Sequence, residues 1–135
     1  MYKYYDAAAL AGLTIAHIER RTTGGDQIAF DTTDGRKWVM LHEQDCCELV
    51  FINDIVGDIK GLVGSPLIVA REDITNEWPQ DVPKPEYCDE SFTCTAYTFE
   101  TASAKVRIRW FGMSNGCYSE SVQIGERMDE LATAP

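Results

Sequence analysis

Short stretches in which apolar and polar residues alternate, separated by glycine-containing turns, constrain the fold of this chain more than any other feature. The stretches 14–20, 27–32 and 37–42 are joined by turns that contain Gly24-Gly25 and Asp34-Gly35. These turn residues favour hairpins, because a two-residue turn needs the positive φ that glycine adopts without strain. Alternation with period two is typical of a strand that buries one face. The pattern therefore predicts consecutive antiparallel strands.

The same pattern continues along the chain and indicates the fold class. Further strands are expected at 47–53, 65–71, 92–100, 105–111 and 118–124. The stretch 65–71 is almost entirely apolar, so it is expected to be a central strand buried on both faces. We predict an α+β domain that is mostly β, an antiparallel meander of about seven or eight strands with one or two short helices. A curled sheet and a half-open barrel fit this pattern equally well.

One domain is expected over 1–135, because a chain of this length suits a single core. Short helices are expected in 1–12 and in 54–63. The segment 72–91 is predicted to be a long acidic loop, since it carries three prolines, and 126–135 is predicted to be a tail. The apolar members of the alternating sets are expected to be mostly buried, namely Ile15, Ile28, Phe30, Val39, Leu41, Val50, Ile52, Leu67, Val69, Val106, Ile108, Val122 and Ile124.

The charge balance restricts the partners that the chain can bind. The sequence has 12 Lys and Arg against 22 Asp and Glu, which gives a net charge of −10. Direct binding to nucleic acid or to an acidic membrane surface is disfavoured, because both need positive charge on the protein. A basic protein surface is favoured, because opposite charges speed and orient association.

Location and redox state are predicted from the apolar runs and the cysteines. No apolar run approaches the roughly 18 residues that cross a bilayer. The first residues lack the pattern of a signal peptide, so a cytoplasmic location is expected. Five cysteines, an odd number of which two are adjacent, argue against structural disulfides in that compartment.

Most of the negative charge lies in two windows, 42–60 and 71–90. Five acids against one lysine give −4 in the first, and seven acids against two basic residues give −5 in the second. Clustered acids with exposed aromatic side chains are typical of a surface that binds a basic groove, although a solubilising loop has the same composition. The candidate partner-binding residues are Asp45, Glu48, Glu72, Asp73, Glu77, Trp78, Asp81, Glu86 and Tyr87.

A second candidate site lies in and after 105–111, where arginines alternate with apolar residues. Such a strand could bind the phosphate of a small nucleotide while aromatic rings stack on its base. A solvated outer sheet face is the competing interpretation. The alternative ligand-binding residues are Arg107, Arg109, Trp110, Tyr118 and Glu120.

The turn around the adjacent cysteines concentrates side chains that can bind metals. His42, Asp45, Cys46, Cys47 and Glu48 lie within seven residues, and Cys117 occupies a similar turn. The stretches 38–52 and 108–124 share a strand, a polar turn and an acid. Hairpins in general have this plan, which is the favoured interpretation. The alternative is that the two turns lie close together and form one surface feature. Adjacent cysteines on a strand point to opposite faces, and no Cys-x-x-Cys occurs. No metal, cofactor or catalytic residue is therefore predicted.

Several motifs occur together in this chain. They include Gln44-Asp-Cys-Cys-Glu48, Gly61-Leu-Val-Gly-Ser-Pro-Leu67 and Tyr118-Ser-Glu-Ser-Val122. Over 12–125 the sequence resembles a family of small phage and prophage proteins that is described as a domain of unknown function. The resemblance implies a phage-encoded accessory protein in the cytosol of the bacterial host, and it carries no catalytic assignment. Cys117 departs from the family pattern, in which an aromatic residue is expected.

The resemblance and the acidic charge together lead to an expected function. We expect a non-enzymatic protein that binds and inhibits a host factor, as a counter-defence inhibitor of the anti-CRISPR or anti-restriction type. Its partner would be a basic surface of a host protein or complex, including a groove that normally holds nucleic acid. Two alternatives remain, a small-molecule binder that sequesters a nucleotide defence signal and a metal-dependent hydrolase.

Overall fold

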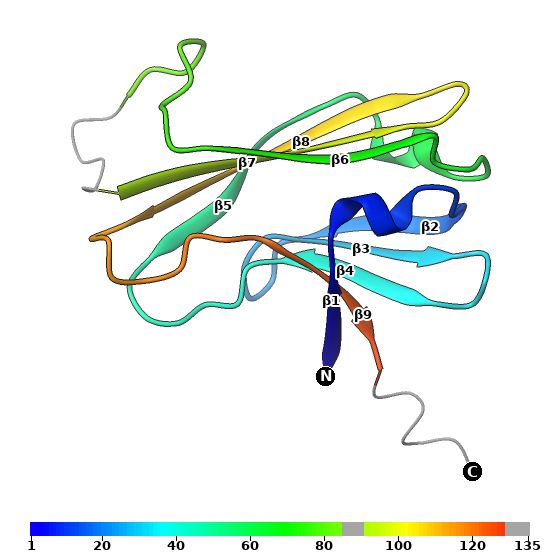
Figure 1. Cartoon of the computed structure of the whole chain (residues 1–135), viewed down its shortest axis with the longest axis horizontal. Helices are drawn as coiled ribbons and strands as arrows, with labels where there is room; N and C mark the ends of the chain where they lie inside the picture. Colours follow the sequence, from blue (N-terminus) through cyan, green and yellow to red (C-terminus); the bar gives the residue numbers. More distant parts are fainter. Residues whose placement is uncertain (85–90, 129–135) are drawn as a thin grey trace.

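Two antiparallel sheets stack face to face and enclose the main core between them (Figure 1). The structure is a computed structural model, which describes residues 1–84 and 91–128. One sheet has the strand order β1-β9-β4-β3-β2 and the other has the order β5-β8-β7-β6. The strands are β1 Tyr2–Tyr5, β2 Ile15–Arg21, β3 Gln27–Thr32, β4 Lys37–Leu41, β5 Leu49–Val56, β6 Val69–Thr75, β7 Ser91–Glu100, β8 Lys105–Ser114 and β9 Gln123–Arg127. The predicted mostly β, antiparallel class is confirmed, with two stacked sheets in place of one curled sheet.

The β2–β3–β4 meander follows the sequence pattern closely. Gly35 has a φ of +89° in the turn between β3 and β4, as the Asp-Gly signal predicts. Ile18 pairs with Phe30, which pairs with Trp38, so three large apolar side chains form one row on the inner face. The predicted core is also confirmed, because every residue of that list except the half-buried Val50 and Val69 is buried.

The segment 54–75 differs most from the prediction. β5 continues to Val56, so the expected helix in 54–63 is reduced to the 3-10 turn η2, Ile59–Leu62. The apolar run 65–71 was expected to form a strand buried on both faces, which is wrong. Leu67 is buried beneath the N-terminal segment, to which its backbone is hydrogen-bonded, and β6 begins only at Val69. β6 is an edge strand, and within residues 1–84 and 91–128 it pairs with β7 alone.

The two ends of the described chain also differ from the prediction. Residues 1–12 hold β1 followed by the 3-10 turn η1, Ala7–Leu10, instead of a helix alone. The strand expected at 118–124 begins only at Gln123, and as β9 it extends to Arg127, into the segment expected to be a tail. Both differences have one cause, because β1 and β9 pair with each other and β1 has no other partner strand in the part of the chain that the structure describes. No helix in residues 1–84 and 91–128 is long and apolar enough to cross a membrane.

The four-stranded sheet carries a smaller apolar cluster on the face turned away from the main core. Phe92, Cys94, Phe111 and Met113 form this cluster. Phe51, Trp78 and Val82 pack against it. The segment 76–84, which follows β6, therefore folds over the outer face of the sheet and brings its acidic residues there.

Candidate functional site

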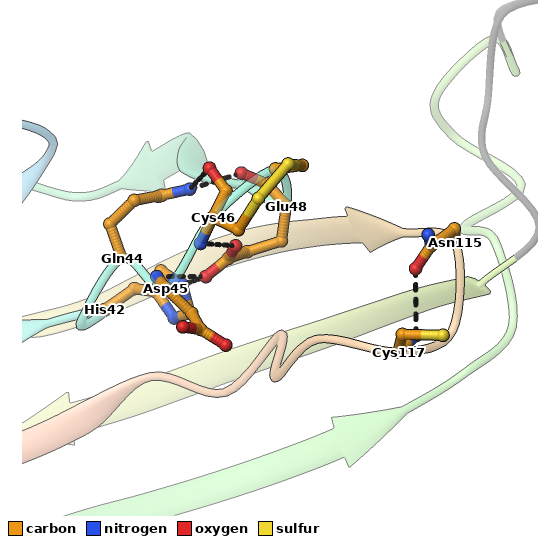
Figure 2. The surroundings of a disulfide bond; sticks show 8 residues. His42, Gln44, Asp45, Cys46, Glu48, Asn115 and Cys117 are labelled. Atoms are coloured by element: carbon orange, nitrogen blue, oxygen red, sulfur yellow. Dashed lines mark hydrogen bonds and ion pairs between the residues drawn. A yellow bond between two sulfur atoms is a disulfide. The ribbon is translucent and has the colours of Figure 1, made fainter.

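The loop between β4 and β5 is built around one buried carboxylate, that of Glu48 (Figure 2). Its oxygens accept hydrogen bonds from the backbone N–H groups of Asp45 at 2.7 Å and Cys46 at 2.9 Å. The Nε2 of His42 donates a third bond at 2.7 Å. These donors, the Asp45 amide foremost, lower the pKa of Glu48 to about 2 despite its burial. Glu48 is therefore ionised at neutral pH and organises the loop. The expectation that Glu48 contacts a partner is wrong, because its side chain is buried.

His42 connects this loop to the segment that precedes β9. Its Nδ1 donates to the carbonyl oxygen of Ser121 at 2.6 Å, while its Nε2 donates to Glu48. A carbonyl oxygen can only accept, and the carboxylate is ionised, so both contacts are satisfied when both ring nitrogens carry hydrogen. The side chain is only 5% exposed. His42 is thus a structural link between two loops.

The two cysteine-containing turns lie at the same end of the four-stranded sheet, which favours the alternative interpretation of their similarity. Leu49 at the start of β5 pairs with Met113 near the end of β8, so the turns that adjoin these residues lie at the same end of the sheet. Figure 2 shows Cys46 in one turn and Cys117 in the other. Across residues 1–84 and 91–128, no three His, Cys, Asp or Glu side chains are grouped so that they could hold a metal ion.

Cys46 and Cys47 are joined by a disulfide bond, so the expectation that the chain has none is wrong for this pair. The two residues lie in a bend before β5 and not on a strand, which lets their sulfur atoms meet. Both residues are exposed. Cys117 is an exposed thiol, and Cys94 is a thiol whose pKa is raised by burial. Cys88 lies outside the described residues.

Alkylation of native protein purified without reductant tests this bond. Trypsin releases peptide 38–60 with Cys46 and Cys47 and peptide 110–127 with Cys117. We expect Cys46 and Cys47 to resist iodoacetamide until a reductant is added, because their sulfurs are already bonded. Cys117 should be alkylated under both conditions and serves as the internal control. Free labelling of Cys46 and Cys47 without reductant would contradict the disulfide.

A second cluster of charge lies on the outer face of the four-stranded sheet, where Arg109 is held by two carboxylates. Arg109 donates to both oxygens of Asp54 at 2.9 and 3.0 Å, and to both oxygens of Asp81 at 3.0 and 2.8 Å. Its side chain is only 8% exposed. Arg109 lowers the pKa of Asp81, and Asp81 followed by Asp54 raises the pKa of Arg109. The two acidic windows of the sequence therefore meet at this arginine.

Trp78 holds the segment 76–84 against the sheet. Its ring centroid lies 4.5 Å from that of Phe92 and 5.1 Å from that of Phe111. Its Nε1 donates to the carbonyl oxygen of Val82 at 2.7 Å. The side chain is half-buried in its own chain, and so it is less free to anchor a partner than the sequence suggested. Glu86 and Tyr87 lie outside the described residues.

Three other predicted partner-binding acids lie along one exposed stretch, 71–77, which we call the acidic edge. All seven of its residues are exposed, and they include Glu72, Asp73 and Glu77 against a single arginine. The stretch begins within the edge strand β6 and runs into the segment that folds over the sheet. Ile74, within it, is 60% exposed. Asp45 is also exposed, in the loop of the disulfide.

The five residues of the alternative nucleotide site are not brought together. Arg107 and Arg109 lie on the outer face of β8, whereas Trp110 is buried in the main core on the inner face. Glu120 is buried where it accepts hydrogen bonds from Ser114 and from Thr93, and Tyr118 is half-buried in the turn before it. These positions follow from strand alternation, which puts Arg109 and Trp110 on opposite faces.

Sequence reasoning missed Asp54, one of the two carboxylates that anchor Arg109. It had been placed in a predicted helix, whereas β5 continues through it to Val56. A β-bulge between Ile52 and Asp54 shifts the register, so that Asp54 pairs directly with Arg109. The signal that could have found it is the cross-strand preference of an acid for an arginine.

Comparison with known proteins gives one match. A family model described as a domain of unknown function (DUF7448) matches residues 8–124, which include β2 to β8 and the start of β9. A search of curated proteins and a search of solved structures found no match.

Proposed function

We propose that this chain, which belongs to the DUF7448 family of domains of unknown function, is a non-enzymatic module that binds a basic surface of another protein through its acidic edge. The observation that carries the proposal is the continuity of exposed, negatively charged residues along 71–77 on an open sheet edge. The net charge of −10 acts in the same direction, because it attracts basic partners over distances longer than a contact.

An open sheet edge adds a specific mode of recognition. The outer edge of β6 presents backbone N–H and C=O groups that no neighbouring strand uses in the described residues. An extended segment of a partner can add to such an edge through backbone hydrogen bonds. Acidic side chains on the edge oppose pairing with a second acidic copy of the chain and favour a basic segment. Charge therefore selects the partner, and backbone pairing holds it.

The resemblance to phage proteins makes the proposal more specific. On that basis the partner is a bacterial host factor, and the binding inhibits it in the host cytosol. A counter-defence role of the anti-CRISPR or anti-restriction type fits an acidic module, because the proteins that it opposes use basic grooves to hold nucleic acid. Asp81, in the segment that folds over the sheet, adds further negative charge, since its side chain remains 62% exposed while it contacts Arg109.

Charge reversal within the acidic edge tests the proposal. We suggest capturing partners of the intact protein from a bacterial host, identifying them by mass spectrometry, and measuring their binding kinetics with purified components. Replacing Glu72, Asp73 and Glu77 together by lysine is expected to slow association about tenfold or more, because steering by opposite charge is lost. Raising the salt concentration should slow association of the wild type in the same way.

A matched triple reversal on the other sheet separates surface charge from total charge. Glu19 on the edge strand β2, Asp31 on β3 and Glu43 after β4 are at least partly exposed, and replacing all three by lysine changes the net charge equally. This control should associate almost as fast as the wild type. Equal losses in both triple variants would mean that only the total charge matters, and unchanged binding in the edge variant would refute the proposal.

A further inference from the structure

The outer face of the four-stranded sheet also carries a row of basic residues. Val56 pairs with Arg107, Arg107 pairs with Thr98, and Thr98 pairs with Arg71, so one row crosses all four strands. Directly paired residues lie on the same face of a sheet, and Lys105 joins them because it precedes Arg107 by two positions. With Gly57, these residues line a shallow hollow of about 410 Å³. Three cations thus surround one hollow in a protein of net charge −10.

Arg107 has unused capacity to donate hydrogen bonds. Its Nη2 lies 3.6 Å from Asp54, whose carboxylate is already engaged by Arg109 at shorter distance. Its Nε is buried and has no hydrogen-bond partner. A buried donor without an acceptor is unfavourable and calls for an explanation. The side chain as a whole is 41% exposed, so an acceptor in the hollow would be reached by its other donor atoms, and binding there would hold the guanidinium in place.

The spacing of the row suits an anion with several oxygens. Arg71 and Arg107 lie two strand spacings apart, about 10 Å between their backbones, and both side chains are long enough to converge above Thr98. Thr98 is buried between them. Arg71 donates from its Nε to Asp73 at 2.9 Å and remains 60% exposed. Guanidinium groups bind phosphate oxygens in pairs, whereas a lysine ammonium acts as a point charge.

Gly57 shapes the wall of the hollow where β5 meets β8. Its φ is +98°, and a Cβ there would lie 2.4 Å from the carbonyl oxygen of Lys105. The absence of a side chain lets the two strands approach and sets Lys105 beside the neighbouring Val56. Val56 is 54% exposed and gives the hollow an apolar side. The hollow is therefore basic on one side and apolar on the other.

We propose that Arg107, Arg71 and Lys105 form a binding site for a small phosphate-bearing anion on the outer face of the four-stranded sheet. Arg107 and Arg71 donate to the phosphate oxygens from either side, and Lys105 neutralises the remaining charge. Asp54 and Asp73 lie beside the two arginines and weaken the attraction, so modest affinity is expected. This inference does not rest on the acidic-edge proposal, although Arg71 belongs to both surfaces, and its main variant, Arg107→Gln, lies outside the acidic edge.

Calorimetric titration at low ionic strength tests the site with inorganic phosphate, pyrophosphate and AMP as probes. We expect the full chain to bind at least one of them, with Arg107→Gln weakening the binding about tenfold or more, because one charge-assisted donor set is lost. Arg21→Gln is the matched control. Arg21 is an exposed strand arginine that contacts an acid two positions away, as Arg71 does, but it lies on the other sheet. This control should bind within about twofold of the wild type.

The outcomes distinguish the possible ligands and can overturn the site. Binding of phosphate and AMP with equal affinity would assign recognition to the phosphate alone. Stronger binding of AMP would show that the apolar side of the hollow near Val56 also contacts the ligand. No binding of any probe, or equal loss in Arg107→Gln and Arg21→Gln, would refute the proposal. If Arg107→Gln does not fold, Arg71→Gln and Lys105→Gln decide, since both side chains are exposed and each should weaken binding.

Discussion

Replacing Arg109 by methionine is expected to lower the free energy of unfolding by about 2–3 kcal/mol. The substitution leaves Asp54 and Asp81 facing each other without the cation that joins them, and it removes a contact in which the guanidinium lies 5.6 Å from the ring centre of Phe111. The loss stays below that of a fully buried ion pair because Asp81 is largely exposed and solvent screens its charge. Urea denaturation followed by circular dichroism measures the change.

Two companion variants locate the effect. Arg107→Met removes a neighbouring arginine that is 41% exposed and has one ion-pair contact at 3.6 Å, so it should cost less than about 1 kcal/mol. Asp81→Asn weakens the link between segment 76–84 and the sheet but leaves the pair with Asp54 intact, so an intermediate loss is expected. Equal losses of unfolding free energy in Arg109→Met and Arg107→Met would contradict the prediction. They would show that the contacts of Arg109 with Asp54 and Asp81 do not contribute more to stability than a partly exposed arginine does.

Replacing Glu48 by glutamine should destabilise the protein at pH 7 and remove part of its acid sensitivity. The pKa of Glu48 is lowered from 4.5 to about 2 in the folded protein. A carboxyl with a lowered folded-state pKa contributes stability above its ordinary pKa and loses that contribution as the pH falls through the folded value. The difference in unfolding free energy between wild type and Glu48→Gln is therefore expected to be largest at neutral pH and to shrink between pH 4.5 and pH 2.

Urea denaturation of both proteins across this pH range provides the measurement. Glu43→Gln is the control, because Glu43 lies in the same loop, is exposed and makes no ion pair among those of the described residues. It should have little effect at any pH. The difference in unfolding free energy between wild type and Glu48→Gln could instead stay constant from pH 7 to pH 2. That result would show that the substitution disturbs packing alone and that the ionised carboxylate does not contribute to stability.

The parts of the fold that could be predicted are those determined by neighbouring residues. The turn at Gly35 and the alternation of Ile28 and Phe30 act within a few positions, and both have the predicted structure. Strand pairing over long distances could not be predicted. An apolar run such as 65–71 has the same composition whether a second strand or a 3-10 turn covers it. In this chain η1 and the residues after it cover Leu67.

The same limit applies to the candidate sites. The clustering of acids in two windows is visible in the sequence, and three of the acids do form an exposed stretch along β6 and beyond it. The sequence does not reveal the contacts that engage other acids, such as Asp54 and Asp81, within the protein. Arg109 lies 55 residues from Asp54 and 28 from Asp81, and only the register of β5 with β8 and the packing of Trp78 bring them together.

The placement of β9 between β1 and β4 has a consequence for the synthesis of this protein. Tyr5 and its hydrogen-bond partner Glu126 are 121 residues apart, so β1 has no strand to pair with until nearly all of the described chain has been translated. Contacts between such distant residues form slowly, because the loop between them must be closed first. On the ribosome, β1 and one edge of β4 therefore stay open to other chains, and the five-stranded sheet is completed only after translation has passed residue 127.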